Sequence, residues 1–89
     1  MKISQLEMFL AISESGSIAE AARRVGKSRT TLSSSLSALE DELGVELLQR
    51  TGNQVMLTNI GQVIKNDCER MVMIANDIAG RCEQHLQGV

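Results

Sequence analysis

The chain of 89 residues has no proline, tryptophan or tyrosine, and Phe9 is its only phenylalanine. A chain with so few rings lacks a surface on which the bases of a single-stranded nucleic acid can stack, so we exclude that class of binding. Because proline is absent and most of the charged residues favour helices, the composition predicts long helices rather than a strand-rich fold. Hydrophobic residues make up 43% of the chain, which is enough for a small aliphatic core in one domain.

Cysteine and histidine are also scarce. Cys68 and Cys82 have neither the spacing of a zinc site nor that of a disulfide framework, and the lone His85 has no set of further ligands around it. The sequence has no P-loop and no GxGxxG motif, and no serine or cysteine forms a plausible catalytic constellation with the histidine. We therefore expect no metal, no cofactor and no enzyme activity, and we expect His85 to be a packing residue.

Long hydrophobic runs are missing as well. The longest runs, residues 8–12 and 71–75, have five residues each, whereas about 18 are needed to cross a bilayer. Polar and charged residues interrupt the N-terminal segment, which therefore does not resemble a signal peptide. These absences favour a cytoplasmic protein of bacterial type, with reduced thiols and no membrane partner.

Charge is unevenly distributed around a net value of −2. Residues 23–29 contain four basic residues and no acid, whereas residues 40–46 contain four acids and no base. A chain with this polarity can bind a polyanion at one end and stay soluble through the rest, and we expect the acidic run 40–42 to be a solvated face. The basic residues are Arg23, Arg24, Lys27 and Arg29, and the acidic residues are Glu40, Asp41, Glu42 and Glu46.

Helical periodicity, capping residues and glycine stops predict four helices, over about 4–14, 17–26, 28–44 and 58–87. Two short apolar stretches around a Gly-Asn tip predict a β-hairpin over about 47–57. The expected N-terminal caps are Ser4 with Glu7, Ser17 with Glu20, Ser28, and Thr58, and the expected stops are Gly26 and Gly44. The apolar stripes of the second and third helices are Ile18, Ala21, Ala22 and Val25, and Leu32, Leu36, Leu39 and Leu43.

Only a short turn around Gly26 and Lys27 separates the second and third helices, which is typical of a helix-turn-helix. Opposite its leucines, the third helix carries small hydroxyl side chains, which allow close approach to base edges in the DNA major groove. Because the acids lie at its far end, this helix should enter the groove N-terminus first, with basic residues neutralising phosphates beside it. The candidate DNA contacts are Ser17, Arg23, Lys27, Ser28, Arg29, Thr30, Thr31, Ser33, Ser34 and Ser37, with Arg50, Asn53 and Gln54 in the hairpin.

The fourth helix has an apolar seam with alternating spacings of four and three, which requires a partner helix. The predicted dimer interface consists of Ile64, Cys68, Met71, Ala75, Ile78 and Cys82, and the seam continues through His85 to Val89. We interpret the two cysteines as small buried hydrophobic residues. The alternative is a redox role, in which antiparallel pairing about Ala75 sets Cys68 opposite Cys82 of the partner subunit.

The segment from about Leu6 to Ile64 resembles the N-terminal winged helix-turn-helix of LysR-type transcriptional regulators. This resemblance implies that the hairpin is the wing and that the fourth helix is a linker helix, which pairs antiparallel with its copy. It also implies a ligand-sensing domain that follows in the complete regulator. The resemblance rests on the runs SGSIAEAARR at 15–24, LEDELGVELLQR at 39–50 and LTNIG at 57–61, with Leu6, Phe9, Ser28 and Ser33.

Five positions depart from the family pattern. Arg29 and Thr30 stand where the family usually has glutamine followed by proline or alanine, Ser34 and Asn53 replace basic residues, and Leu48 replaces phenylalanine. An arginine fork at position 29 can read guanine or grip phosphate in place of the glutamine. Fewer basic residues predict fewer phosphate contacts, and therefore weaker binding and a shallower salt dependence for each half-site.

The sequence thus predicts a mainly α-helical protein with a winged helix-turn-helix over 1–58 and a linker or dimerisation helix over 59–89. The expected function is sequence-specific binding of double-stranded DNA with dyad symmetry, by a homodimer or by a tetramer of the complete protein. RNA polymerase is a further candidate partner. The alternative is a helical protein-interaction module that dimerises and does not bind DNA.

Overall fold

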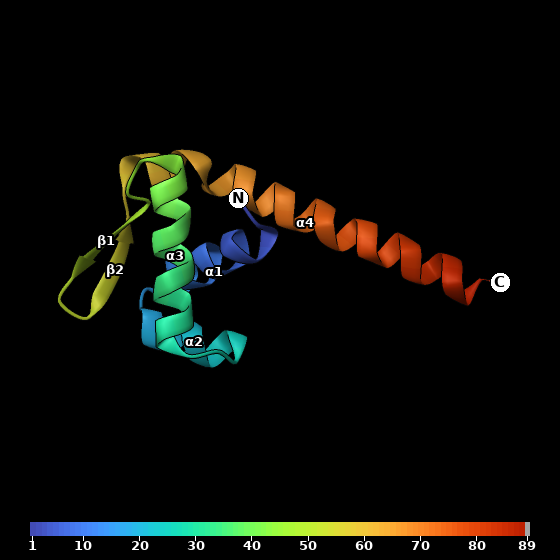
Figure 1. Cartoon of the computed structure of the whole chain (residues 1–89), viewed down its shortest axis with the longest axis horizontal. Helices are drawn as coiled ribbons and strands as arrows, with labels where there is room; N and C mark the ends of the chain where they lie inside the picture. Colours follow the sequence, from blue (N-terminus) through green and yellow to red (C-terminus); the bar gives the residue numbers. More distant parts are fainter. Residues whose placement is uncertain (89) are drawn as a thin grey trace.

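The computed structural model describes residues 1–88. The helices and the hairpin within residues 3–57 gather at one end of the molecule, and the long C-terminal helix projects away from them (Figure 1). This arrangement confirms the predicted mainly α-helical winged helix-turn-helix with a long C-terminal helix. The elements are α1 (Ile3–Ser15), α2 (Ile18–Val25), α3 (Arg29–Leu43), β1 (Leu48–Thr51), β2 (Gln54–Leu57) and α4 (Asn59–Gln87).

Three of the predicted N-terminal caps are confirmed, because in each the side-chain oxygen accepts a hydrogen bond from the backbone N–H three residues later. These bonds link Ser17 to Glu20 at 3.0 Å, Ser28 to Thr31 at 3.1 Å and Thr58 to Gly61 at 3.0 Å. The turn between α2 and α3 depends on Gly26, whose φ of 70° lies in the left-handed region that side chains disfavour. Local sequence therefore fixes both ends of the helix-turn-helix.

The predicted cap at the start of α1 is wrong. The helix begins at Ile3 with Lys2 as the N-cap residue, so neither Ser4 nor Glu7 occupies a capping position. Instead, the backbone N–H of Lys2 donates to the side-chain oxygen of Gln5 at 2.8 Å. The glutamine thus satisfies the backbone N–H of the N-cap residue. The helix begins one residue before Ser4.

The hydrophobic core lies where α1, α2, α3, the hairpin and the first half of α4 meet, and Phe9 is its one aromatic residue. Two members of the predicted stripes fall outside it, since Val25 is 37% exposed and Leu43 is 39% exposed. Each is the last residue of its helix, where the chain turns at a glycine, and there the side chain is only partly covered. The largest fully buried side chains are Leu6, Phe9, Ile12, Leu32, Leu39 and Leu47.

The hairpin is held by hydrogen bonds to the α1–α2 turn and to α3. The N–H of Val55 in β2 donates to the carbonyl of Gly16 at 2.9 Å, which ties the hairpin to the α1–α2 turn. The carboxylate of Glu40 accepts from the N–H groups of Leu47 at 2.6 Å and Leu48 at 3.3 Å. Glu40 is therefore half-buried and structural, which corrects the prediction that the whole acidic run is a solvated face.

The start of α4 packs tightly against the chain just before β1. The Thr58 N–H donates to the carbonyl of Leu47 at 3.0 Å, and the Thr58 hydroxyl donates to the carbonyl of Glu46 at 2.7 Å. A Cβ atom at Gly61 would lie 2.2 Å from the same Leu47 oxygen, so only glycine fits there. This close approach fixes the direction in which α4 leaves the winged helix-turn-helix.

The first half of α4 covers the core of its own chain. Cys68 is 5% exposed, and Ile64 and Val72 are partly buried against the same core. Cys68 therefore does not lie on a seam open to a partner, because the core of its own chain already covers it. Ile64 keeps part of its surface exposed, so its place in a dimer interface stays a prediction. The seam is exposed to solvent mainly in the second half of α4. Its last predicted member, Val89, lies outside the described residues.

Candidate nucleic-acid interface

The N-terminal half of α3 presents a polar surface to solvent. Arg29, Thr30, Ser34 and Ser37 are exposed, whereas Ser33 is half-buried at the side that faces the hairpin. Their spacing along one helix keeps the hydroxyl groups on the side opposite the buried leucines, as the sequence predicts. Unpaired backbone N–H groups and the helix dipole add a partial positive charge at this end.

Two of the predicted contact residues also build the helix start. The Ser28 hydroxyl accepts from the Thr31 N–H and lies 2.8 Å from the Thr31 hydroxyl, so these two side chains hold each other. Both remain exposed. They bring the cap of α3 to the surface, where at least one hydroxyl group can still bond to a further partner.

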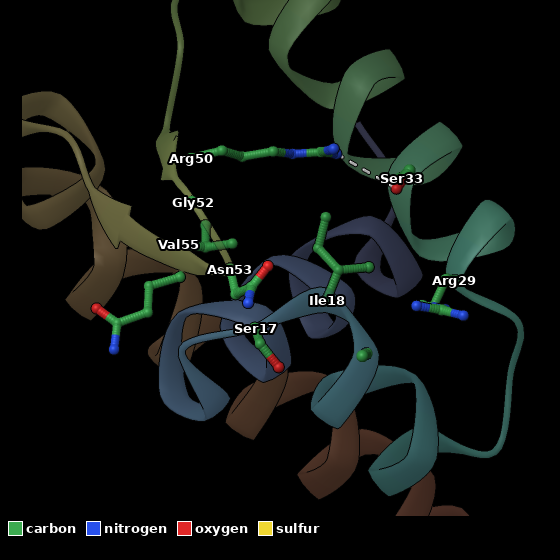
Figure 2. Close-up of a pocket in the computed structure, with 10 residues that line it drawn as sticks. Ser17, Ile18, Arg29, Ser33, Arg50, Gly52, Asn53 and Val55 are labelled. Carbon is green, nitrogen blue, oxygen red and sulfur yellow. Dashed lines mark hydrogen bonds between the residues drawn. The ribbon is translucent and has the colours of Figure 1, made fainter.

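A hollow of about 510 Å³ separates α3 from the hairpin and reaches the start of α2. Figure 2 shows Ile18 and Val55 in the middle of this hollow, with Ser17 and Asn53 near them. Three segments far apart in the sequence thus place polar and basic groups around one concave surface. The predicted contact residues that line it are Ser17, Arg29, Ser33, Arg50, Asn53 and Gln54.

One side chain crosses the hollow. Arg50 extends from β1 toward α3, and its Nη2 atom lies 3.4 Å from the Ser33 hydroxyl oxygen (Figure 2). At this distance the hydrogen bond is weak, so the guanidinium stays available to another acceptor. The arrangement sets a basic group of the hairpin directly beside the hydroxyl face of α3.

A second hollow lies at the turn between α2 and α3, and Arg23, Lys27, Ser28 and Arg29 line it. Arg23 forms an ion pair with Glu20 one helical turn earlier. The guanidinium of Arg23, through its hydrogen bond and its charge, lowers the pKa of the Glu20 carboxyl. Glu20 therefore stays ionised and holds one of the basic groups that were assigned to phosphate.

Arg24 points to a different part of the molecule. Its guanidinium donates to the Ser15 hydroxyl at 2.9 Å and lies 3.9 Å from a carboxylate oxygen of Glu14. Both partners stand at the end of α1. The four basic residues at 23–29 are therefore not equivalent, since two of them, Arg23 and Arg24, already have acidic partners.

Sequence reasoning missed the apolar floor of the first hollow and the pairing of Glu20 with Arg23. Ile18 was assigned to the core stripe of α2, yet it is only half-buried and lines the hollow with Val55. No pattern in the neighbouring sequence indicates that the hairpin lies beside Ile18. The ion pair had a readable signal, because an acid and an arginine three residues apart on a helix are neighbours.

The predicted dimer residues divide into two groups along α4. Met71 is 43% exposed and Ile78 is 59% exposed, and Cys82 is also exposed, whereas Cys68 is inside the core. Burial raises the pKa of the Cys68 thiol, and the neighbouring acids Asp67 and Glu69 add to the shift. Within residues 1–88, no helix combines the length and apolar character that a membrane span needs.

Comparison with known proteins identifies the family. Residues 3–62 match the family described as bacterial regulatory helix-turn-helix protein, lysR family. The chain belongs to the lysR family. The match covers α1, α2, α3, the hairpin and the first residues of α4, and it confirms the resemblance found in the sequence.

Relatives in this lysR family are regulators much longer than the chain. It is 33% identical over 88 residues to the HTH-type transcriptional regulator TcbR of Pseudomonas sp. (strain P51), covering 99% of the chain and 30% of that protein. It is 38% identical over 74 residues to ClcR of Pseudomonas putida, covering 83% of the chain and 25% of that protein. The chain thus spans less than a third of either regulator.

Solved structures of DNA-binding domains share the fold of the chain. The chain matches the DNA-binding domain of CbnR, crystallised as a complex with DNA, with a TM-score of 0.88 and 32% identity over 97% of the chain and 99% of that domain. It also matches the DNA-binding domain of BenM in complex with benA site 1 DNA, with a TM-score of 0.85 and 25% identity over 94% and 98% of the two chains.

Proposed function

We propose that the chain binds double-stranded DNA sequence-specifically, as the DNA-reading domain of a dimeric LysR-type transcriptional regulator. One observation carries the proposal. The fold superposes over 97% of its length on a lysR-family domain that was crystallised on DNA. In this proposal residues 1–58 read DNA, residues 59–89 form the linker helix whose second half dimerises, and the ligand-sensing domain belongs to the complete regulator.

The proposed reading element is α3. An α-helix with its side chains is about 10–12 Å across and fits the major groove, which is about 12 Å wide. The exposed groups at its N-terminal end include a guanidinium at Arg29 and hydroxyls at Thr30 and Ser34. An arginine can bond guanine through two parallel hydrogen bonds, and hydroxyls can bond either bases or phosphates. The acidic end of the helix then points away from the duplex.

The proposed backbone clamp is the hairpin. The hollow beside α3 is also lined by Arg50, Asn53 and Gln54. A duplex bound to α3 therefore brings its sugar-phosphate backbone or the adjacent minor groove to these residues. A guanidinium there supplies charge, while the two amides supply hydrogen-bond donors without charge. Such contacts fix the register of the protein on DNA rather than its sequence preference.

The proposed dimer forms through the second half of α4. This helix has 29 residues, which at about 1.5 Å per residue makes it about 43 Å long. Met71, Ala75, Ile78 and Cys82 lie on its open seam, and antiparallel pairing of two copies produces a two-fold axis. Two copies of α3 then face half-sites about one helical turn, about 34 Å, or a multiple of it apart. Tetramers and contact with RNA polymerase belong to the complete regulator, which as a bacterial regulator acts in the cytoplasm.

A fluorescence-anisotropy titration with mixed genomic duplex at low salt tests the proposal. We expect the wild-type chain to bind and Arg29→Ala to weaken binding about ten-fold or more, because it removes a charged contact at the tip of α3. Arg81→Ala is the matched control, since Arg81 is exposed on α4 and lines neither hollow; it should change affinity less than about two-fold. If a folded dimer binds no duplex, the proposal fails and the protein-interaction alternative is favoured.

A further inference from the structure

Two ion pairs of the same kind lie on different helices. In α2 the guanidinium of Arg23 contacts the carboxylate of Glu20, and in α4 that of Arg70 contacts Asp67. Both pairs have the i,i+3 spacing, and in both the arginine is the more exposed partner, at 74% and 69%. One pair lies on α2 and the other on α4. A comparison of the two therefore separates the effect of the α2 pair on DNA binding from the effect of any such ion pair.

The α2 pair borders the proposed DNA surface. Arg23 lines the hollow at the α2–α3 turn together with Lys27, Ser28 and Arg29. No residue of α4 lines either this hollow or the one between α3 and the hairpin. A phosphate that approaches Lys27 or Arg29 therefore also approaches Arg23, and meets the negative charge of Glu20 with it.

We infer that Glu20 restrains Arg23 and so weakens the contacts of this chain with DNA phosphates. The affinity for DNA is then reduced whatever the base sequence. The inference rests on the proposed function. A guanidinium held by a carboxylate presents little net charge, and it must exchange that partner before it can bind a phosphate oxygen. The release of counterions from neutralised phosphates is the main source of sequence-independent affinity. A chain that neutralises fewer phosphates releases fewer counterions and therefore has less of this affinity. Base contacts from α3 then supply a larger share of the binding energy.

The test is Glu20→Gln, which keeps the shape of the side chain and removes its charge. The Ser17 cap survives, because it binds the backbone N–H of residue 20 and not the side chain. For duplex of arbitrary sequence at low salt we expect affinity to rise about three- to ten-fold for the dimer. The slope of log affinity against log salt should steepen by up to about 0.9 per protomer, as one phosphate contact is added.

Asp67→Asn is the matched control, because it breaks the equivalent pair on α4. We expect no change in affinity or salt slope from it. The variants Arg23→Gln and Glu20→Gln with Arg23→Gln complete a double-mutant cycle. If Glu20 acts through Arg23, the gain from Glu20→Gln is larger when Arg23 is present than when it is replaced.

Three results would overturn the inference. An unchanged affinity of Glu20→Gln, with normal binding by the wild type, contradicts the restraint and leaves the proposed function standing. An equal gain in both backgrounds of the cycle shows that Glu20 acts as a bare charge and not through Arg23. Absence of wild-type binding to every duplex removes the proposed function, and the inference falls with it.

Discussion

The two halves of α4 have the same helical backbone and opposite relations to the rest of the molecule. In the first half, Gly61 touches the backbone of Leu47 and Cys68 is buried in the core. In the second half, Met73, Ile74 and Ile78 are each more than half exposed, and Figure 1 shows this half projecting clear of the other elements. The first half therefore belongs to the folding unit, whereas the second half exposes apolar surface that its own chain does not cover.

One continuous apolar seam can therefore serve two purposes, packing against its own chain and exposing a surface for another chain. A heptad-like pattern reports only that one side of a helix is apolar, and it does not say whether that side meets its own chain or another. Here the change occurs near Val72, the last residue of α4 that packs against the core. Substitutions before and after this point should therefore have different consequences.

The largest expected effect concerns two glycines of the same helix. Gly61→Ala should lower the free energy of unfolding by about 1–3 kcal/mol, because the new methyl group meets the Leu47 carbonyl and forces the helix away. Gly80→Ala has open space around the added Cβ, and should raise helix stability by up to about 1 kcal/mol. Urea unfolding at one protein concentration measures both. Equal destabilisation by the two variants would contradict the division of α4.

The second effect concerns dimerisation. Ile78→Asp places a charge on the open seam of the proposed dimer and should weaken self-association about ten-fold or more, while the monomer keeps its fold. Asn76→Asp adds the same charge two residues away on another side of the helix, and should leave association nearly unchanged. Sedimentation equilibrium measures the monomer–dimer constant. Dissociation by Asn76→Asp alone would place the interface on a different face.

The last effect concerns the two thiols and leaves both the fold and the dimer unchanged. The pKa of Cys68 is raised by burial, so less reactive thiolate is present at any given pH below that raised value. We expect Cys68 in a Cys82→Ser variant to react with a thiol reagent about ten-fold or more slowly than Cys82 in a Cys68→Ser variant. Rapid reaction of Cys68, or its crosslinking to Cys82 of the partner subunit on a non-reducing gel, would revive the redox alternative and contradict the burial.

Features that depend on neighbouring residues could be predicted from the sequence. The caps at Ser17 and Ser28 and the left-handed stop at Gly26 are local, because the donor, acceptor and backbone angle all lie within one turn. Arg29 and Ser33 of α3 share one hollow with the predicted contact residues of the hairpin for a related reason. Helical periodicity fixes which side of α3 is polar, and the short hairpin cannot reach far from it.

Features that depend on the path of the whole chain could not be predicted. Glu40 binds N–H groups seven and eight residues away, across a turn whose shape no local pattern reveals. The side of α4 that faces α1 is set by the close contact at Gly61, so the assignment of Cys68 to a dimer seam failed. The pairing of Glu20 with Arg23 is different, since its spacing was readable and only its consequence for DNA binding was not.

The central claim is that the tip of α3 and the hairpin together form the DNA-contacting surface. Amide chemical shifts of the ¹⁵N-labelled chain, followed during titration with mixed genomic duplex at low salt, test it most directly. The largest changes are expected at residues 28–37 and 50–54, with little change at the outer end of α4. Unchanged shifts at the tip and the hairpin, with changes concentrated on the outer half of α4, would contradict the claim.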